Sequence, residues 1–387
     1  MLLAMTLIAF SVSKVFAYTS SGAQHLTALT VEELRIEQAE KALPTIAKIL
    51  TKRYETFTKQ IKKAKLLSQL TENCLFHGNK LWQESVTSLV QTKNFDDRGL
   101  YWSRLKMTKS LRTLPLFSQL TSQQQEKLLW QFELASRGQQ DVIFNSKTSK
   151  KILITGFDPF FLDKNIDQSN PSGVAAMQFD DLRINFDGQQ AEIESLMFPV
   201  RFADFDQGIV EQLLAPHITD VDMIVTISMG RTEFDLERFP GLRRSALAPD
   251  NLNVLTGAHS GNPLIPLLDN QPLMGPEFVE FSLPVGAMKK AIGVYKINDN
   301  HQVTTTTKTF KPNNYVQLKN EISVQGAGGG YLSNEISYRS ILLRNKQRPL
   351  LPVGHIHTPR ISAFQPEEIA NIVAQIGEML SQSLKSI

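Results

Sequence analysis

The chain has 387 residues, of which 42% are hydrophobic and 20% are charged, and its formal net charge is +3. This length exceeds one ordinary domain and accommodates two hydrophobic cores. The composition is typical of a globular protein, and the small net charge gives no reason to expect a nucleic acid or a charged membrane surface as a partner.

The chain begins with an apolar segment, MLLAMTLIAFSVSKVFA, whose apolar run is too short to span a bilayer. Val15 and Ala17 are small or apolar at the positions that a signal peptidase reads, so we expect a signal peptide at residues 1–17, cleaved before Tyr18. The mature protein is then exported, to the periplasm or the cell exterior. Because no Lys or Arg precedes the apolar run, a buried N-terminal helix or strand is the alternative. No later stretch predicts a stable membrane span.

Residues 18–147 predict an α-helical domain, because they hold all three tryptophans but few of the glycines and prolines. Apolar residues recur at helical intervals from Leu34 onward. Thr30 and Glu33 resemble a capping box at the start of this pattern, and Pro44 should interrupt the helix. Further helices are expected around residues 81–90, 101–111 and 122–135.

The two halves of the chain differ in charge. Residues 18–150 carry an excess of Lys and Arg, and residues 151–387 carry an excess of Asp and Glu. We interpret the basic residues as solvated helix faces. The alternative is electrostatic docking of the helical half onto the acidic half or onto another anionic surface.

Cys74 is the only cysteine, so an exported chain of this sequence has no internal disulfide. Its helical pattern predicts a small core hydrophobe. A reactive Cys74 assisted by His77 is the alternative, although no glycine-rich turn accompanies it.

Residues 148–387 alternate strand and helix signals. Buried strands are expected within residues 150–160, 222–230 and 348–359, and helices within residues 171–182, 205–216, 284–295 and 366–386. The alternation predicts an α/β domain with an open, mostly parallel sheet flanked by helices, preceded by a separate all-α domain. Sites in such sheets form at the carboxyl ends of the strands.

Two kinds of reactive side chain lie at or near these strand ends. His355 and His357 are two residues apart on a predicted strand, so both should face the same side. Ser333 follows the glycine-rich GAGGG and precedes a predicted helix, where it is either a nucleophile or the N-cap. No cluster of His, Cys or Asp completes a metal site, so we expect no metal.

Taken in order, the motifs of residues 151–387 resemble the pyroglutamyl peptidase I (pyrrolidone-carboxylate peptidase) family. They are ILITGFDPF (152–160), NPS (170–172), FPVRF (198–202), MGRTEFDLER (229–238), APDN (248–251), MGPEFVEFSLPV (274–285), GGYLSNEISY (329–338) and GHIHTP (354–359). The resemblance implies that family's α/β fold and a peptidase that removes an N-terminal pyroglutamyl group.

The resemblance also implies roles for individual residues. Ser333 stands at the nucleophile position, where the family has cysteine, and Glu237 and His357 stand at the other two catalytic positions. Phe157 and Phe160 match the aromatic residues that flank the lactam ring, and Leu332 is expected beside them in substrate binding. Neither an organic cofactor nor a metal is implied.

Three further departures from the family pattern concern the surroundings of the site. Phe161-Leu162 replaces the glycine pair that follows GFDPF in bacterial members, residues 286–325 are longer than the family needs, and the helical half has no counterpart in its small members.

Because serine needs a well-placed base to attack, two functions stay open. One is a hydrolase with a Ser333-His357-Glu237 triad that acts on a peptide or a small acyl amide. The other is an inactive relative that binds pyroglutamyl-like or other small acyl groups, and a different acyl substrate is a third possibility. The sequence does not indicate the oligomeric state.

Overall fold

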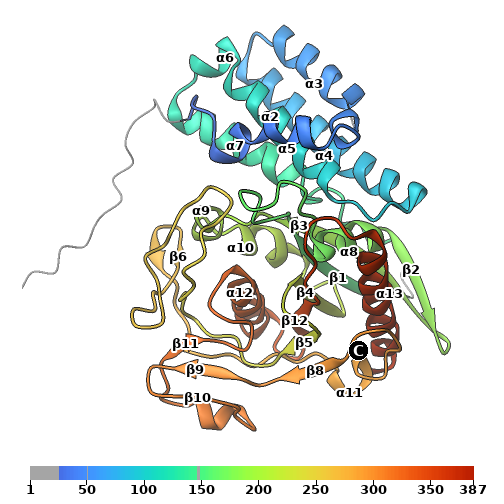
Figure 1. Cartoon of the computed structure of the whole chain (residues 1–387), viewed down its shortest axis with the longest axis vertical. Coiled ribbons are helices and arrows are strands. Elements are labelled where there is room, and N and C mark those ends of the chain that lie inside the picture. Colours follow the sequence, from blue (N-terminus) through green and yellow to red (C-terminus); the bar gives the residue numbers. More distant parts are fainter. Residues whose placement is uncertain (1–25, 50, 146–148) are drawn as a thin grey trace, which may run out of the picture.

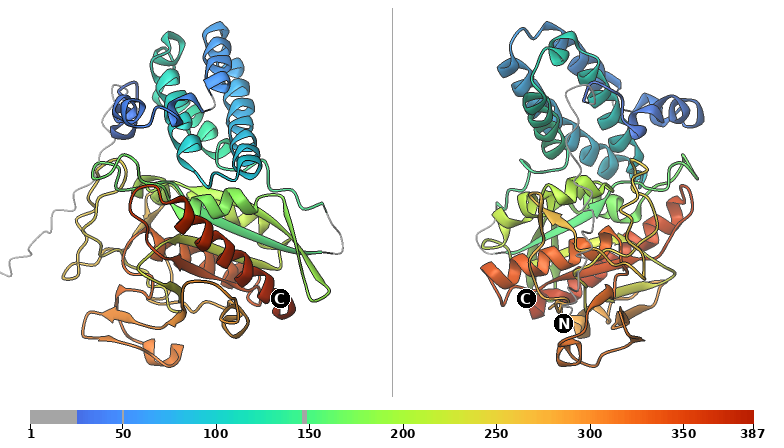
Figure 2. Two further views of the ribbon diagram at one scale, coloured as in Figure 1. Left: turned by 45° about the vertical axis from the view of Figure 1, so that its right-hand side comes forward. Right: turned by 90° about the vertical axis from the view of Figure 1, so that its left-hand side faces the viewer.

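The computed structural model describes residues 26–49, 51–145 and 149–387. The predicted signal peptide, residues 1–17, lies outside these residues. We call residues 26–145 the helical region and residues 149–387 the α/β region. The helical region is stacked on one end of the α/β region (Figures 1 and 2).

Every regular element described in the helical region is a helix. The elements are α1 (Val31–Leu34), α2 (Ile36–Ala42), η1 (Ile46–Lys48), α3 (Thr51–Lys63), α4 (Leu67–Thr92), α5 (Arg98–Arg112), α6 (Pro115–Ser118) and α7 (Ser122–Ala135). The predicted capping box is confirmed, because Thr30 Oγ1 accepts from Glu33 N at 3.2 Å and Glu33 Oε2 accepts from Thr30 N at 2.8 Å. The predicted break is confirmed as well, since α2 ends two residues before Pro44. The helix expected around residues 81–90 is part of the longer α4.

Cys74 is a fully buried core residue of α4, as the helical pattern predicts. Burial raises the pKa of its thiol far above the ordinary value, so the thiol stays protonated. Its proposed partner His77 is turned to other groups: Nε2 lies 2.7 Å from Gln60 Oε1 and Nδ1 lies 3.2 Å from Arg53 Nη1. A reactive Cys74–His77 pair is therefore excluded.

A seven-stranded sheet forms the centre of the α/β region, in the order β2-β3-β1-β4-β12-β5-β8. Its strands are β1 (Lys150–Phe157), β2 (Leu182–Phe186), β3 (Gln189–Phe198), β4 (Met223–Met229), β5 (Phe234–Glu237), β8 (Ile297–Asn300) and β12 (Val353–Thr358). Strands β3, β1, β4 and β12 are parallel, β2 and β5 run antiparallel to their neighbours β3 and β12, and β8 is parallel to β5. The predicted open, mostly parallel sheet is confirmed.

Helices cover both faces of this sheet (Figure 2). They are α8 (Pro171–Phe179), α9 (Phe202–Asp206), α10 (Ile209–Leu214), η2 (Ala215–His217), α11 (Val285–Met288), α12 (Leu332–Gln347), α13 (Pro366–Ser383) and η4 (Leu384–Ser386). Helix α8 packs with α13, and α10 packs with α12. The prediction of a helix over residues 284–295 is wrong after Met288, where α11 ends. Beyond α11, Ile292 and Val294 are 83% and 72% exposed, so only Ala291 and Tyr295 pack against the core and little burial stabilises a longer helix there.

Short elements complete the α/β region. Strands β9 (Val303–Thr305), β10 (Thr309–Phe310) and β11 (Ser323–Gln325) form a small antiparallel sheet, β6 (Leu267–Leu268) pairs with β7 (Gln271–Pro272), and η3 spans Tyr315–Leu318. Strand β8 and the small sheet lie within the long segment 286–325.

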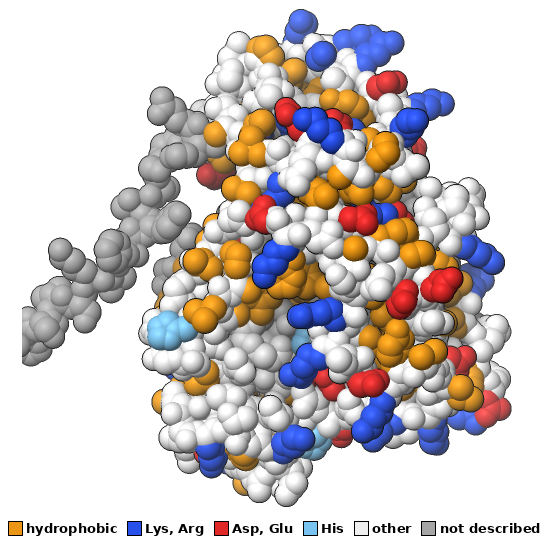
Figure 3. All heavy atoms as spheres, in the orientation of Figure 1, with side chains coloured by type: hydrophobic (Ala, Val, Ile, Leu, Met, Phe, Trp, Pro, Cys, Tyr) orange, Lys and Arg blue, Asp and Glu red, His pale blue; other side chains and the backbone are white. Residues whose placement is uncertain are grey.

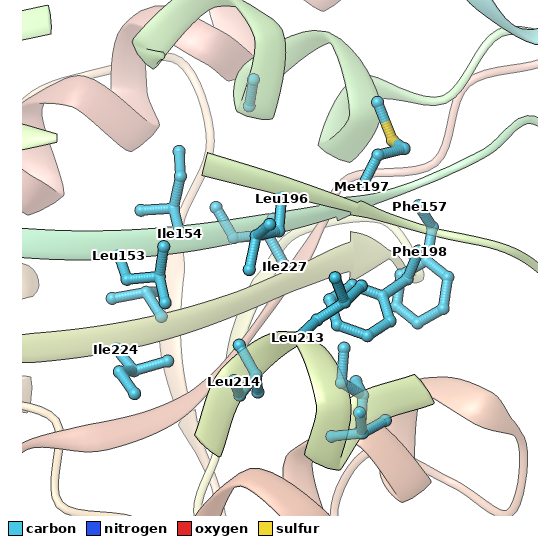
Figure 4. Packing of buried hydrophobic residues seen from close by; sticks show 14 of the residues in the cluster. Leu153, Ile154, Phe157, Leu196, Met197, Phe198, Leu213, Leu214, Ile224 and Ile227 are labelled. Carbon is cyan, nitrogen blue, oxygen red and sulfur yellow. The ribbon is translucent and has the colours of Figure 1, made fainter. Parts of the chain in front are cut away.

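One cluster of buried hydrophobic residues extends from the helical region into the sheet. Near β1, β3 and β4 it includes Ile154, Leu196, Phe198 and Ile227 (Figure 4), and in α4 it includes Trp82. None of the helices in the described ranges is long and apolar enough to cross a membrane.

Charged residues of the helical region are buried where it meets the α/β region. Arg104 Nη1 lies 2.9 Å from Asp158 Oδ1, and Arg137 Nη2 lies 2.7 Å from Asp158 Oδ2. At the edge of the interface, Arg35 Nη2 lies 2.6 Å from Asp163 Oδ2, and Arg98 also pairs with an aspartate of the α/β region. The interpretation of the basic residues as solvated helix faces is therefore wrong at this interface, where the alternative of electrostatic docking holds.

Candidate active site

The strand ends of the α/β region surround a cavity of about 240 Å³. The lining residues are Phe157, Phe160 and Phe161 at and after the end of β1, Asn170 and Val200, Ser228, Met229, Gly230 and Arg231 at the end of β4, Ala246 and Ala248, Gly328, Tyr331, Leu332 and Ser333 around the start of α12, and His357 and Arg360 at the end of β12. The cavity thus lies at the carboxyl ends of parallel strands, where α/β sheets place their ligands.

His357 and Glu237 form a buried pair behind this cavity. His357 Nδ1 lies 2.5 Å from Glu237 Oε1, and Glu237 is fully buried. Asn300 Nδ2 donates to the other carboxylate oxygen, Oε2, at 2.8 Å. Burial raises the pKa of Glu237, and the nearby His357 opposes that shift. Within the described residues His357 Nε2 has no hydrogen-bond partner, so the nitrogen opposite the carboxylate is free to bind a group in the cavity.

The local fold explains why these two side chains meet. Strands β5 and β12 are antiparallel neighbours, and His357 is paired with Asp235, two residues before Glu237. Gly230 lies against the imidazole, because a Cβ on Gly230 would be 2.5 Å from the Cβ of His357. A side chain at position 230 would therefore displace His357 from its place beside the carboxylate.

Ser333 is the second residue of α12, and the N-cap of that helix is Tyr331. The interpretation of Ser333 as the N-cap is therefore wrong. Ser333 Oγ donates to Gly328 O at 3.3 Å and lines the same cavity as His357. The described structure contains no hydrogen bond between Ser333 and His357. A hydroxyl in the first turn of this 16-residue helix lies near unpaired backbone N–H groups and the positive end of the helix dipole.

His355 is on the same side of β12 as His357, and the two rings are 4.9 Å apart between centroids. Both of its nitrogens are occupied: Nδ1 lies 2.8 Å from Thr226 Oγ1 and Nε2 lies 2.8 Å from Ser228 Oγ. Burial, together with the charge of His357, lowers the pKa of His355 well below its ordinary value. His355 is thus a neutral core residue that does not line the cavity.

The three residues expected to bind substrate all line the cavity. Phe157 is 3% exposed, and its ring stacks on Phe205 with centroids 6.2 Å apart. Phe160 is half-buried, and Leu332 is buried at the first position of α12. Together they form an apolar wall next to Ser333.

Phe161 also lines the cavity, which the sequence reasoning did not assign to it. Its φ angle is +64°, in the left-handed region that favours glycine. Its ring lies 4.4 Å from that of Phe160. The signal was present in the sequence, since Phe161 occupies a position where the resembled family has glycine.

Asn300 is a further residue that sequence reasoning did not identify. It lies at the end of β8, inside the long segment 286–325, and its amide also donates to Ala327 O at 3.0 Å. It therefore connects Glu237 to the loop before Ser333. No local motif marks it, because its partner Glu237 is 63 residues away in the chain.

Within the described residues, Asp141, Asp180 and Asp181 are the only group of three His, Cys, Asp or Glu side chains close enough to hold a metal ion. None of them lines the cavity. Asp180 accepts from Trp82 Nε1 at 3.0 Å and from Ser195 N at 2.8 Å, which are structural contacts between α4 and β3.

The described structure is a mostly parallel α/β protein with a helical region at its N-terminal side and a cavity at the strand ends. The chain belongs to the PA0049 family: the model described as the PA0049 C-terminal domain matches residues 151–268 and 277–362, and the PA0049 N-terminal domain model matches residues 16–133. Uncharacterized protein PA0049 of Pseudomonas aeruginosa is 27% identical over 395 aligned positions, which cover 78% of this chain and 71% of that protein.

The α/β region is also similar to pyrrolidone-carboxylate peptidases. That of Streptococcus suis is 26% identical over 224 residues, covering 57% of this chain and 81% of the relative. Among solved structures, pyrrolidone carboxyl peptidase of Pyrococcus furiosus matches with a TM-score of 0.42 and 19% identity, covering 61% of this chain and 99% of that one. Pyroglutamyl peptidase I of Bacillus amyloliquefaciens matches with a TM-score of 0.41 and 18% identity, covering 61% and 98% of the two chains.

Proposed function

We propose that the protein is an amide hydrolase that removes an N-terminal pyroglutamyl group, with Ser333 as nucleophile, His357 as base and Glu237 as the residue that orients His357. The observation that carries the proposal is the buried His357–Glu237 pair, with its 2.5 Å hydrogen bond and a free Nε2, at a cavity that Ser333 lines. A buried carboxylate fixes the imidazole tautomer and stabilises the imidazolium that forms when the base takes a proton.

The proposed reaction has two steps. Ser333 Oγ attacks the acyl carbon while its proton passes to His357 Nε2, and the tetrahedral oxyanion is stabilised by backbone N–H groups in the first turn of α12. His357 then gives the proton to the leaving amine, and an acyl ester of Ser333 remains. Water then attacks this ester while His357 takes one of its protons, and His357 returns that proton to Ser333 Oγ as the ester bond breaks and pyroglutamate leaves.

The cavity suits a small neutral acyl group. Its wall of Phe157, Phe160 and Leu332 is apolar, and a lactam ring has two flat faces that pack well on aromatic side chains. A volume of about 240 Å³ accommodates a five-membered ring and part of the next residue.

One observation favours the second candidate, a binding protein without catalysis. Ser333 Oγ donates to Gly328 O and not to His357, so the hydroxyl must rotate before His357 can accept its proton. If it does not rotate, the cavity binds acyl groups without cleaving them.

The two functions are distinguished with a fluorogenic pyroglutamyl amide and a serine-reactive phosphonate. The hydrolase releases the fluorophore, and its labelling by the phosphonate disappears in Ser333→Ala. Ser333→Cys is the informative companion, because a thiol ionises more readily than a hydroxyl. Release by Ser333→Cys alone indicates an intact pocket with an inactive native nucleophile, and no release by either chain refutes the hydrolase.

The cellular location is a separate proposal. We propose that residues 1–17 direct export and are removed. Mass spectrometry of the protein purified from its native cell checks this, since the mature chain would begin at Tyr18 and fractionate with the periplasm or the medium.

A further inference from the structure

The cavity contains positive charge without lining carboxylates. Arg231 and Arg360 are its charged lining residues apart from the titratable His357, and none of the Asp or Glu side chains in the described structure lines it. Figure 3 shows basic side chains beside a recess on this face of the molecule. A ligand that enters this space therefore meets an apolar wall and two guanidinium groups.

The two arginines differ in how far their charge is neutralised. Arg231 is 56% exposed and pairs loosely, with Nε 3.3 Å from Asp235 Oδ2 and Nη2 3.6 Å from Glu237 Oε1. Arg360 is exposed, and its guanidinium has neither a hydrogen bond nor an ion pair to any residue that the structure describes. Arg360 is thus free to bind an anion, and Arg231 contributes a partly neutralised charge beside it.

Their positions follow from the order of the strands. The aromatic wall of Phe157, Phe160 and Phe161 lies at the end of β1, whereas Arg231 follows β4 and Arg360 follows β12. These strands are adjacent in the order β1-β4-β12. Arg360 N donates to Arg231 O at 2.7 Å, so the two loops are held together. The cavity therefore has an apolar side above β1 and a basic side above β12.

His357 lies on the basic side, since it is a residue of β12 itself. In the proposed reaction His357 protonates the leaving amine, so the released half of the substrate lies toward β12. The acyl half then lies toward the aromatic wall above β1. The basic residues consequently face the released half of the substrate.

We propose that the preferred substrates carry a carboxylate on the released half, close to the scissile amide, and that Arg360 binds it with support from Arg231. This inference rests on the proposed function and names its substrate class: short pyroglutamyl peptides with a free C-terminal carboxylate or an acidic second residue. A guanidinium binds a carboxylate through charge-assisted, often paired hydrogen bonds.

Binding to the Ser333→Ala chain tests the inference without requiring turnover. Calorimetry compares three peptides. Pyroglutamyl-alanine has a free C-terminal carboxylate, pyroglutamyl-alaninamide has no carboxylate, and pyroglutamyl-glutamic acid α-amide has only its side-chain carboxylate. We expect the peptides with a carboxylate to bind about tenfold more tightly than pyroglutamyl-alaninamide, the effect of one charge-assisted hydrogen bond at a partly exposed site. Which of the two binds more tightly identifies the carboxylate that Arg360 receives.

Substitutions on the Ser333→Ala background assign the effect to its residue. Adding Arg360→Ala should remove most of the preference, and Arg360→Glu should reverse it. Lys346→Ala, which removes one exposed charge of α12 that does not line the cavity, should leave the preference unchanged. High salt should reduce the preference, because exposed charges are screened.

The outcomes separate the inference from the proposed function. Equal binding of pyroglutamyl-alanine and its amide, or a preference that persists in Arg360→Ala, overturns the inference even if the intact chain hydrolyses the neutral fluorogenic amide. A carboxylate preference without hydrolysis by the intact chain supports the anion site and refutes the hydrolase. If none of the three peptides binds, the inference is wrong.

Discussion

The buried charged residues of the helical region and of the α/β region have different roles. In the α/β region the buried pair His357–Glu237 lies next to the cavity and leaves one imidazole nitrogen free. In the helical region, buried Arg104 and Arg137 form ion pairs with Asp158. Asp158 lies in the chain between Phe157 and Phe160, two of the aromatic residues that line the cavity. No described residue of the helical region lines the cavity itself. The α/β region thus supplies the proposed reactive groups, and the helical region holds the loop that carries the aromatic wall.

A second contact has the same character. Asp97, just before α5, accepts from Ser169 Oγ at 2.6 Å and from Asn170 N at 3.1 Å. Asn170 lines the cavity, and its amide donates to Asp158 O at 3.0 Å. The helical region therefore binds both ends of the connection between β1 and α8, which carries part of the cavity wall, through buried polar groups. The comparison predicts that substitutions in the two regions change different measured quantities.

The largest effect is expected for Glu237→Gln, which keeps the shape of the side chain but removes its charge. The amide stabilises the imidazolium poorly and favours the wrong imidazole tautomer, so kcat toward a pyroglutamyl amide should fall by about 10³–10⁴-fold. The thermal midpoint should change little. Glu233→Gln, on the loop before β5, is the matched control and should retain activity. A loss of activity that follows the loss of folded protein would place Glu237 in a purely structural role.

In the helical region Arg137→Met should mainly lower stability. The substitution leaves the buried carboxylates of Glu133 and Asp158 without one of their partners, and breaking a buried ion pair costs about 3–5 kcal/mol. Denaturant unfolding followed by tryptophan fluorescence and by circular dichroism measures the loss. Because one hydrophobic cluster joins the regions, both signals should shift together.

The exposed Lys127→Ala, on the same helix α7, is the control and should leave the unfolding free energy within about 0.5 kcal/mol of the native value. If Arg137→Met melted the helices alone and left the α/β region folded, the two regions would be independent, and the proposed support of the cavity would be wrong.

Asp97 should make the stability of the protein depend on pH. Burial raises its pKa to about 8, against the hydrogen bond from Ser169. Its ordinary value is about 4, so between these two values the folded chain holds a proton that the unfolded chain has lost. Stability should therefore decline as pH rises from about 4 to about 8, by at most about 1.4 kcal/mol per pH unit.

Urea unfolding at several pH values measures this slope. Asp97→Asn, which keeps an oxygen acceptor but cannot ionise, should show a shallower decline than the native chain. An unchanged slope would mean that Asp97 is already ionised in the folded protein.

The sequence predicted the parts of this fold that depend on local patterns. Alternating apolar runs and helices identified β1, β4 and β12, and the capping box at Thr30 needs only neighbouring residues. Periodicity could not distinguish His357 from His355, because they face the same side of one strand; the resemblance favoured His357. The structure distinguishes the two histidines, because the hydroxyls of Thr226 and Ser228 occupy both ring nitrogens of His355.

Contacts between distant segments could not be predicted. Asn300 reaches Glu237 from a segment that had no recognised role, and the pairing of Arg104 and Arg137 with Asp158 depends on how two regions dock. The opposite net charges of the two halves suggested that they dock, but they did not indicate which residues form the contacts. The predicted division at residues 147/148 stays a prediction.

The smallest expected effect concerns Phe161, a non-glycine residue held at a positive φ in the cavity wall. A left-handed conformation costs a residue with a Cβ about 1–2 kcal/mol, whereas glycine adopts it freely. Strained conformations are concentrated at functional sites, so we infer that the Phe161 side chain has a role in the cavity. The ring of Phe161 narrows the aromatic side of the cavity, and its removal should weaken the binding of a pyroglutamyl group.

A pair of variants separates strain from contact. Phe161→Ala and Phe161→Gly both remove the ring, so both should raise KM for a pyroglutamyl amide about fivefold, in keeping with the loss of one apolar contact of roughly 1 kcal/mol. Only Phe161→Gly relieves the backbone, so it should be more stable than Phe161→Ala by about 1 kcal/mol. Unfolding free energies and steady-state kinetics measure the two quantities independently. If both variants bound the substrate as tightly as the native chain does, the Phe161 ring would not contact the substrate. The positive φ of Phe161 would then be a feature of the turn after β1 alone.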